Sequence, residues 1–311
     1  MSIAVARYEP ADAEEWDAFA ARSRSGHYMI QRGYMDYHAD RFKDHSLLVR
    51  RDDRLVALLP ANRDGSELVS HGGLTFGGFV TDETMSTRRM LEVFETVSLA
   101  LRADGIGSWR YAPVPHIYHR VPAEEDLYAL FRAGARLVRR DVASAIRLDA
   151  RPPYSKGRRA AIQAASRAGI EIERSDDYEE FMDLERAVLR TRHGVDPVHS
   201  AAELALLAGR FPAITLHVAR LDGELAAGIV LYETGRVHHC QYIAVSDPGR
   251  EAHALDLLAD RLIGEREGAV CWWDFGTSNE PETRELNEHL IRNKESYGAR
   301  AIAYDQYLVE L

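Results

Sequence analysis

The chain has 311 residues, of which 46% are hydrophobic and 28% are charged, and its formal net charge is −10. These values lie in the globular range and exclude a disordered or fibrous chain, and the length is about that of two domains. The acidic balance argues against DNA binding and against a broad RNA-binding surface, which would need clustered Lys and Arg.

Neither the N-terminus nor any later stretch has the apolar run of a signal peptide or the roughly 20 apolar residues of a membrane span. Cys240 and Cys271 are too few for a disulfide framework. The histidine spacings fit no familiar zinc site, and there is no HExxH. We therefore expect a cytoplasmic protein with no membrane span and no metal.

The first half of the chain predicts a strand at 3–7 and helices at 11–23 and 28–42, followed by a hairpin that turns at Asp52 and Asp53. The glycine-rich segment SHGGLTFGGFV comes next. It lacks the GxGxxG and GKS/T spacings and so predicts turns rather than a nucleotide-binding loop. The half closes with a helix, the strand SWRYAP, a second helix and the strand RLVRRDVASAIRL.

The segment DARPPYS predicts a linker, because it combines two prolines with polar residues, and it sets the boundary between domains 1–150 and 151–311. After it we expect the basic helix KGRRAAIQAASRAG, a strand, two helices and a second hairpin that turns at Asp222 and Gly223. The strands VHHCQYIAV, AVCWWDF and RAIAYDQYLVEL then alternate with two helices. This order predicts an α/β protein in which helices cover both faces of mixed sheets.

The second half repeats the first at an offset of 164 residues. Trp109 and Tyr111 align with Trp273 and Phe275, and the triplet Gly-Ala-Arg that begins at residue 134 returns at residue 298. The repeat predicts two copies of one supersecondary plan with a ligand cleft between them, and chance similarity of two helix-to-strand segments is the alternative.

A basic belt crosses this acidic chain. From Arg132 to Arg174 there are eleven Lys or Arg against four Asp or Glu. The belt is either a solvated helix joining the domains or a surface that holds a phosphate-bearing substrate or donor.

Read twice, this order of elements resembles the GNAT acyltransferase fold, and the tandem arrangement around a basic helix is similar to the Fem family of aminoacyltransferases. The likeness is carried by KGRRAAIQAASRAGIEIERSDDYEEFMDLERAVLRTRHG, QYIAVSDPGREAHALDLLADRLI, WWDFGTSNE and LIRNKESYGA. In the first half, SHGGLTFGG, PHIYHR and EEDLYALF resemble other tandem GNAT-like proteins. The resemblance implies transfer of an acyl group from a thioester or an aminoacyl-tRNA ester to an amine.

The sequence departs from the family at the loop that cradles the pyrophosphate of acetyl-CoA. There the family's acetyl-CoA users carry an Arg or Gln followed by glycines. This chain has SDPGREAHA, so the residues expected to bind the acyl-CoA co-substrate are Ser246, Gly249 and Arg250. The first copy lacks a glycine pair in this place and is expected to be architectural or substrate-binding.

Lys294 is the leading catalytic candidate. Under the offset of 164 residues it replaces Leu130 at a position that faces inward, and an unpaired buried ammonium is costly. The resemblance implies that this lysine stabilises charge on the transferring carbonyl. The alternative is a snorkelling lysine.

Three further residues are predicted to take part in the chemistry. In VHHCQYIAV, strict alternation puts His239, Gln241 and Ile243 on one face, where His239 is a candidate base. Asp274 ends the central strand, where it suits an alternative base, and Tyr297 suits a general acid. GxSxG is absent, which favours direct attack by the amine over an acyl-enzyme.

The remaining candidates are cationic or polar side chains that would bind the substrate. We predict this role for Arg158, Arg159, Arg192, His193, His199 and Gln241.

Together these residues predict an N-acyltransferase that uses acyl-CoA, with acetyl-CoA favoured, to acylate a small-molecule or sugar-nucleotide amine. The first alternative is a Fem-type enzyme that uses aminoacyl-tRNA as donor and has tRNA as a partner. The second is a tandem binding module without catalysis. The sequence fixes neither the acceptor nor the oligomeric state.

Overall fold

The computed structural model describes residues 2–265, 271–280 and 283–311, apart from the side chains of Arg192 and His193. It divides into two compact units: unit 1 comprises residues 1–141 and 303–311, and unit 2 comprises residues 142–302. The predicted domains, 1–150 and 151–311, differ from these units at both ends of unit 2. Unit 1 takes in the last residues of the chain, and the change from unit 1 to unit 2 falls inside a strand.

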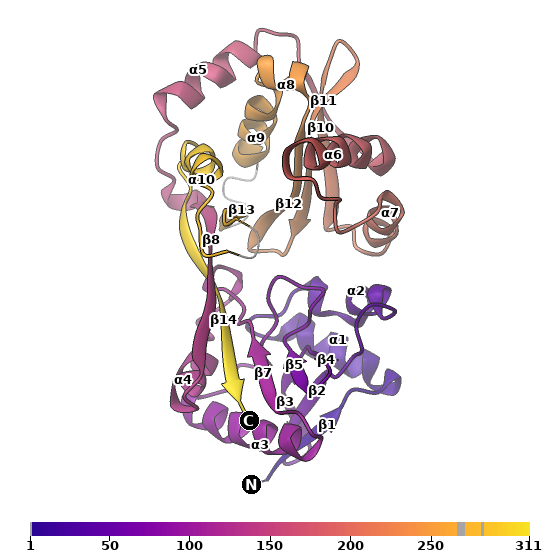
Figure 1. Cartoon of the computed structure of the whole chain (residues 1–311), viewed down its shortest axis with the longest axis vertical. Helices are drawn as coiled ribbons and strands as arrows, with labels where there is room; N and C mark the ends of the chain where they lie inside the picture. Colours follow the sequence, from indigo (N-terminus) through magenta and orange to yellow (C-terminus); the bar gives the residue numbers. More distant parts are fainter. Residues whose placement is uncertain (1, 266–270, 281–282) are drawn as a thin grey trace. The chain divides into compact units, whose positions relative to one another are not determined.

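Unit 1 contains strands of two sheets, and α3 is the longest of its described helices (Figure 1). One sheet has the order β1-β2-β3-β6 and the other β4-β5-β7-β14, with the beginning of β8 beside β14. The elements, in chain order, are β1 Ile3–Arg7, α1 Ala13–Arg22, α2 Arg32–Met35, β2 Leu47–Arg51, β3 Arg54–Leu59, β4 Asn62–Asp64, β5 Glu67–Val69, β6 Val80–Thr81, α3 Thr87–Ala103, β7 Ser108–Tyr111, α4 Glu125–Arg132 and β8 Arg136–Arg147.

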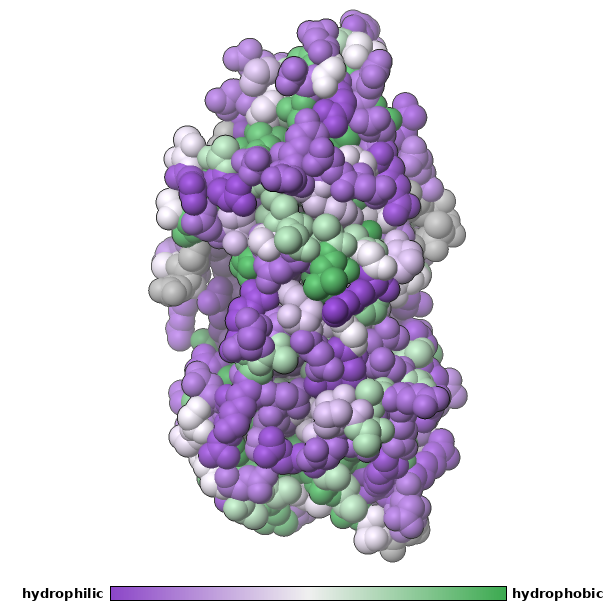
Figure 2. Space-filling view, turned by 90° about the vertical axis from the view of Figure 1, so that its right-hand side faces the viewer, coloured by the Kyte–Doolittle hydropathy of each residue, from purple (hydrophilic) through white to green (hydrophobic). Residues whose placement is uncertain are grey.

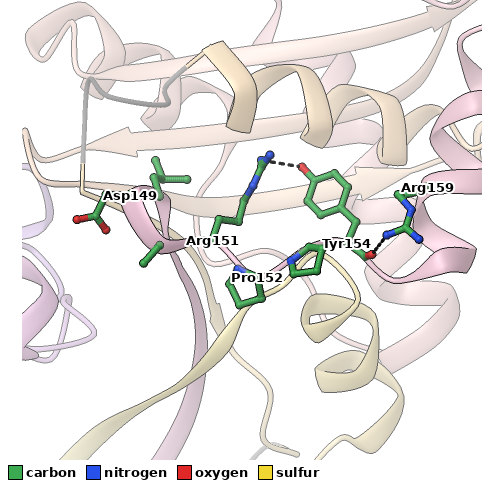
Figure 3. A pocket seen from close by; sticks show the side chains of 8 residues that line it. Asp149, Arg151, Pro152, Tyr154 and Arg159 are labelled. Carbon is green, nitrogen blue, oxygen red and sulfur yellow. Dashed lines mark hydrogen bonds between the residues drawn. The ribbon is translucent and has the colours of Figure 1, made fainter.

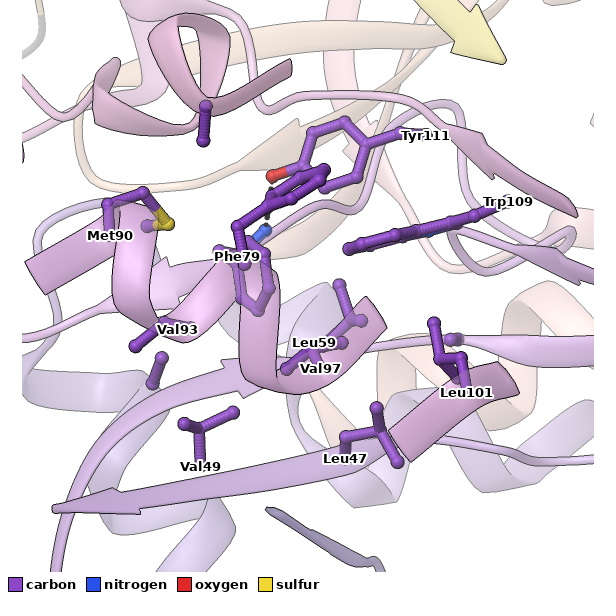
Figure 4. Close-up of a cluster of buried hydrophobic side chains, with 14 of the residues drawn as sticks. Leu47, Val49, Leu59, Phe79, Met90, Val93, Val97, Leu101, Trp109 and Tyr111 are labelled. Atoms are coloured by element: carbon purple, nitrogen blue, oxygen red, sulfur yellow. Dashed lines mark hydrogen bonds between the residues drawn. The ribbon is translucent and has the colours of Figure 1, made fainter. Parts of the chain in front are cut away.

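Alternation along β2 sends neighbouring side chains to opposite faces of the first sheet. Leu48 joins Trp16 and Phe19 of α1 in one core cluster. Leu47 and Val49 join the buried face of α3 in the other, which extends to Trp109 and Tyr111 of β7 (Figure 4). The residues expected to form one helix at 28–42 instead form short helical pieces around α2, because Gln31 is extended (ψ 150°).

Unit 2 is built on one mixed sheet with the order β8-β13-β12-β11-β10-β9. Its elements are α5 Lys156–Ala165, β9 Glu171–Ser175, α6 Tyr178–His193, α7 Ala201–Arg210, β10 Ile214–Leu221, β11 Glu224–Glu233, β12 Val237–Val245, α8 Asp247–Glu251, α9 Ala254–Glu265, β13 Trp272–Thr277 and α10 Glu288–Glu295. The last strand, β14 Arg300–Glu310, begins in unit 2 and continues into unit 1. Helix α9 covers one face of the sheet, and α6 and α7 cover the other (Figure 1).

The elements follow the predicted repeat. The offset of 164 residues relates β7 to β13, α4 to α10 and β8 to β14. Gly134 and Gly298, which follow the two helices, both have positive φ, 71° and 87°, the conformation that lets the chain turn from helix into strand.

The last strand of each copy crosses from one unit to the other. β8 begins in unit 1, and its later residues pair with β13 in unit 2. β14 begins in unit 2, and its residues Tyr307–Glu310 pair with Ser108–Tyr111 of β7 in unit 1. Each unit is therefore completed by a strand from the other copy.

The surface is largely polar, as the 28% of charged residues leads one to expect. Figure 2 shows a face on which hydrophilic side chains predominate and hydrophobic ones form small patches. Across the described ranges, none of the helices is both long enough and apolar enough to cross a bilayer.

Candidate active site

The site lies where β12 and β13 separate. The two strands are parallel neighbours, and their pairs run from Val237–Trp272 to His239–Asp274. Both strands continue past this last pair, to Val245 and Thr277, without pairing further within the described residues. The sheet therefore opens within both strands, on the carboxyl side of His239 and Asp274, and open α/β sheets place their ligands toward the carboxyl side of their strands.

His239 and Asp274 form a buried pair at this point. Asp274 is fully buried, and its Oδ2 lies 2.8 Å from Nδ1 of His239. Its other oxygen accepts a 2.8 Å hydrogen bond from the backbone N–H of Gly276. A carboxylate only accepts hydrogen bonds, so Asp274 holds the proton of His239 on Nδ1 and leaves Nε2 as a base. The His239 side chain is 14% exposed and is therefore open to a small partner.

A kink in β13 at Gly276 exposes the backbone carbonyls that Lys294 contacts. Gly276 has a φ of 71°, and the pairing of β13 with β8 shifts between Asp274 and Thr277. A Cβ at Gly276 would lie 3.3 Å from Cε1 of His239, so the imidazole sits against this glycine. The bulge turns the carbonyls of Gly276 and Thr277 away from the regular ladder, which makes them available to a side chain.

Lys294 of α10 fills that position. Its Nζ donates to the carbonyl oxygens of Gly276, at 3.0 Å, and Thr277, at 2.6 Å, and the residue is 6% exposed. Burial lowers the pKa of Lys294 to about 8, although Asp274 and Cys240 act in the opposite direction. An ammonium has three N–H donors, and two are used here. The third can stabilise a developing oxyanion beside His239.

A bulge in β12 corrects the predicted alternation of this strand. Val230 pairs with Tyr242 and Leu231 with Cys240, so Gln241 is the extra residue. Beyond it the faces exchange. Ile243 therefore lies on the α9 face with Cys240, and the prediction that Ile243 shares the face of His239 is wrong. Gln241, predicted to bind substrate, is half-buried at the bulge itself.

The side chains of Tyr242 and His199 contact each other on the face of the unit 2 sheet that α6 and α7 cover, opposite the α9 face. The Tyr242 hydroxyl lies 2.7 Å from Nδ1 of His199 and accepts a 3.1 Å hydrogen bond from its backbone N–H. His199 is buried just before α7. This contact anchors the connection between α6 and α7 to the sheet. The proposed substrate-binding role of His199 stays a prediction.

Glu185 is an acidic residue that the sequence analysis missed. It lies on α6, one turn after Phe181, and is 5% exposed. Burial raises the pKa of Glu185 to about 7, and its Oε2 is buried without a hydrogen-bond partner among the described residues. The sequence did hold one indication of this burial: Glu185 follows Phe181 by four residues, so both lie on the side of α6 that faces the sheet. α6 packs on β12, so this carboxyl lies in the layer that covers the site.

Tyr297 takes part in a buried network rather than pointing to solvent. Its hydroxyl donates to Oδ1 of Asp256 at 2.9 Å and accepts from Nη1 of Arg158 at 3.0 Å. Arg158 also forms an ion pair with Asp256, and its guanidinium stacks on the Tyr297 ring at 3.8 Å. Burial raises the pKa of Tyr297 well above its usual range. These contacts join α5, α9 and the end of α10, so they give Arg158 a structural position.

The three residues predicted to hold coenzyme A cap and pack helix α8. The Ser246 hydroxyl accepts from the backbone N–H of Gly249 at 3.1 Å, and the Ser246 carbonyl accepts from that of Arg250 at 2.8 Å. A Cβ at Gly249 would come within 2.1 Å of the Ala226 carbonyl, so this glycine permits close packing. Pro248 has no N–H, and Asp247 adds a negative charge. This helix start therefore presents few free amide donors, and the predicted coenzyme A role of these residues stays a prediction.

The other predicted cations lie away from His239. Arg159 is exposed on α5, and its Nη1 donates to the Tyr154 carbonyl at 2.6 Å. Arg192 and His193 end α6, and their side chains lie outside the described part of the structure. In the part of the chain that the structure describes, no group of three or more His, Cys, Asp or Glu side chains is arranged to hold a metal ion.

The family comparison agrees with this architecture. Residues 154–284 match the family model described as an acetyltransferase (GNAT) domain. Unit 2 carries a GNAT domain. The match confirms the predicted acyltransferase class at this level, and it confirms the predicted GNAT-type fold with mixed sheets. No curated protein sequence matches the chain.

Solved structures with the same fold cover nearly the whole chain. FemX has a TM-score of 0.72 at 12% identity, over 100% of this chain and 98% of that chain. The C-terminal domain of a putative lysylphosphatidylglycerol synthetase from Agrobacterium fabrum has a TM-score of 0.64 at 14% identity, over 96% and 92%. A tandem GNAT protein from the clavulanic acid biosynthesis pathway has a TM-score of 0.50 at 14% identity, over 99% and 98%. At these identities the likeness extends to the fold alone.

Proposed function

We propose that the protein is an N-acyltransferase in which His239 deprotonates an acceptor amine and Lys294 stabilises the tetrahedral intermediate. The observation that carries the proposal is the meeting of two groups at Gly276: the His239–Asp274 pair on one side and the Lys294 ammonium on the other. Acyl transfer to an amine needs both a base and an oxyanion donor.

The reaction follows from the protonation states of these groups. Nε2 of His239 takes a proton from the amine nitrogen as that nitrogen attacks the acyl carbonyl. The carbonyl oxygen becomes an oxyanion that the free N–H of Lys294 stabilises. The intermediate then collapses, the bond to the leaving group breaks, and His239 returns its proton to the departing oxygen or sulfur atom.

The buried thiol beside the site supports direct attack over a covalent intermediate. Burial raises the pKa of Cys240 well above its usual range, and the residue is 5% exposed. A thiol reacts as a thiolate, so Cys240 is a poor nucleophile.

The start of α8 favours an ester donor over a coenzyme A thioester. Ser246 uses the amides of Gly249 and Arg250, and Pro248 has none, so few donors remain for a diphosphate. An aminoacyl ester of tRNA is the donor in our proposal, and acyl-CoA, on which many GNAT enzymes rely, is the competing one. A domain of a putative lysylphosphatidylglycerol synthetase shares this fold, and the lysyl group in that name supports an aminoacyl donor.

The donor is tested by supplying each in turn with a panel of amines and following amide formation by mass spectrometry. We expect product with charged tRNA, loss of product after ribonuclease treatment, and no product with acetyl-CoA alone. Product from acetyl-CoA that survives ribonuclease would overturn the choice of donor and leave the catalytic pair in place. No product from either donor, together with amine binding that Lys294→Met leaves unchanged, would favour the binding module.

A further inference from the structure

Two cavities of unit 2 share lining residues at the start of α5. Figure 3 shows the first of them. The first, of about 510 Å³, is lined by residues 148–154 and Arg159. The second, of about 560 Å³, is lined by Tyr154, Lys156, Arg159, Ala160, Ile162, Gln163 and Asp260. Tyr154 and Arg159 belong to both. Each volume is within the range of small-molecule sites, about 300–1,000 Å³.

Three cations face this double groove without a carboxylate partner. Within the described residues, Arg151, Lys156 and Arg159 form no ion pair. Their neighbours differ: Arg147 binds both oxygens of Asp149, and Arg158 is paired with Asp256. Arg158 and Arg159 therefore differ in role. Arg158 belongs to the buried network with Asp256 and Tyr297, and the charged side chain of Arg159 lines the groove.

The hydrogen bonds of these cations leave most of their donors unused. Nη1 of Arg159 donates to the Tyr154 carbonyl at 2.6 Å, and Nη1 of Arg151 donates to the Tyr154 hydroxyl at 3.4 Å, as Figure 3 shows. A guanidinium has five N–H donors and an ammonium has three. These two contacts hold the arginines in place while the rest of each fork stays available, an arrangement that suits an oxyanion with several acceptor oxygens.

The second cavity adds groups that suit hydroxyls. Asp260 and Gln163 line it beside the cations. A carboxylate accepts hydrogen bonds and an amide both donates and accepts, which is the pairing that sugar hydroxyls require. The carboxylate also opposes a bare anion that binds next to it, so the groove discriminates in favour of a ligand that presents phosphate and hydroxyls at different positions.

We propose that this groove binds the phosphate and sugar of a nucleotide-containing substrate, with Arg151, Lys156 and Arg159 on the phosphate and Asp260 and Gln163 on the sugar hydroxyls. The proposed acyl transfer gives the groove its role, which is to hold the molecule that carries the acyl group or the amine. Only this role rests on the proposed function. The nucleotide is either a free small molecule or the end of an RNA strand.

The test is calorimetric titration of the full chain with pyrophosphate, with AMP and with a short single-stranded RNA. We expect AMP to bind and Arg159→Gln and Lys156→Gln each to weaken AMP binding about tenfold, the size of one lost charge-assisted contact. Asp260→Asn should weaken AMP but not pyrophosphate. Arg167→Gln is the matched control, because it removes an exposed charge just after the same helix, outside both cavities.

Each outcome of the titrations either supports or overturns the proposed nucleotide groove. RNA that binds more than tenfold tighter than AMP assigns the groove to RNA, and equal affinities assign it to a free nucleotide; both support the proposal. No heat with any probe at millimolar concentration, or equal weakening by Arg167→Gln, overturns it. His239→Ala should bind AMP like the unaltered protein, so the groove can stand even if no acyl transfer is found.

Discussion

The two units carry the same framework but different chemistry at matching positions. Trp109 and Trp273, related by 164 residues, are both fully buried in their cores. Where unit 2 has the buried Asp274, unit 1 has Arg110, which is exposed and paired with Glu67. The other two differences are Ala112 against Gly276 and Leu130 against Lys294. The shared apolar positions maintain the fold, and these differences, together with His239 on the neighbouring strand, distinguish the site in unit 2 from unit 1.

Lys294→Met makes unit 2 more like unit 1 and should have the largest effect. Leu130 shows that an apolar side chain is accommodated at this position, so we expect the fold to survive. Loss of an oxyanion donor costs about 10²- to 10³-fold in kcat. The measurement is steady-state amide formation beside a thermal melt. A variant that melts normally and turns over normally would remove Lys294 from the mechanism.

His239→Ala should reduce kcat by about 10²-fold or more, the usual contribution of a general base. Asp274→Asn should reduce kcat less than His239→Ala does if Asp274 only orients the imidazole. It also changes the tautomer of His239, because an amide can donate a hydrogen bond to Nδ1. Addition of imidazole to His239→Ala gives the control, since rescue identifies a missing base rather than a damaged fold. An Asp274→Asn variant with full activity contradicts the orienting role.

The pH profile should show the titration of Lys294. The ammonium form is the active one, and its pKa is about 8, so activity should fall as the pH rises through that value. Asp274 raises this pKa, so Asp274→Asn should move the alkaline limb to lower pH. The measurement is kcat against pH for both proteins. Coinciding alkaline limbs would show that another group controls the fall.

Glu185→Gln should change stability more than chemistry. The folded pKa, about 7, lies above the ordinary value of 4.5, so the folded protein holds more protons between those pH values and loses stability as pH rises across them. The glutamine variant lacks this slope and should gain up to about 2 to 3 kcal/mol relative to wild type between pH 5 and pH 8. Urea unfolding at both pH values tests it. Parallel stability curves would show that folding does not raise the pKa of Glu185.

Tyr297→Phe should have the smallest effect on turnover. Its hydroxyl is held by Asp256 and Arg158, and loss of these hydrogen bonds costs about 1 to 3 kcal/mol of stability. A loss of kcat comparable to that of His239→Ala, with an unchanged melting temperature, would instead support its predicted role as general acid.

Much of the fold could be predicted because the periodic spacing of apolar residues indicates which segments form helices and which form strands. The repeat was readable from Trp109, Trp273 and the two Gly-Ala-Arg triplets, and the burial of Lys294 followed from its register with Leu130. The bulge at Gln241 could not be predicted, because a bulge leaves no change in composition and alternation is the default. The orphan carboxyl of Glu185 was hidden for a different reason: an acid on a helix is usually solvated, and only packing shows otherwise.

The exchange of terminal strands has a consequence for how the protein is made. On the ribosome, β7 emerges long before its neighbour β14, because nearly all of unit 2 lies between them in the sequence. Until then this strand has an open edge, which is a template for pairing with other nascent chains. Synthesis of β14 should therefore be the step that closes unit 1, and cells short of chaperones should accumulate this protein as aggregates formed before β14 is made.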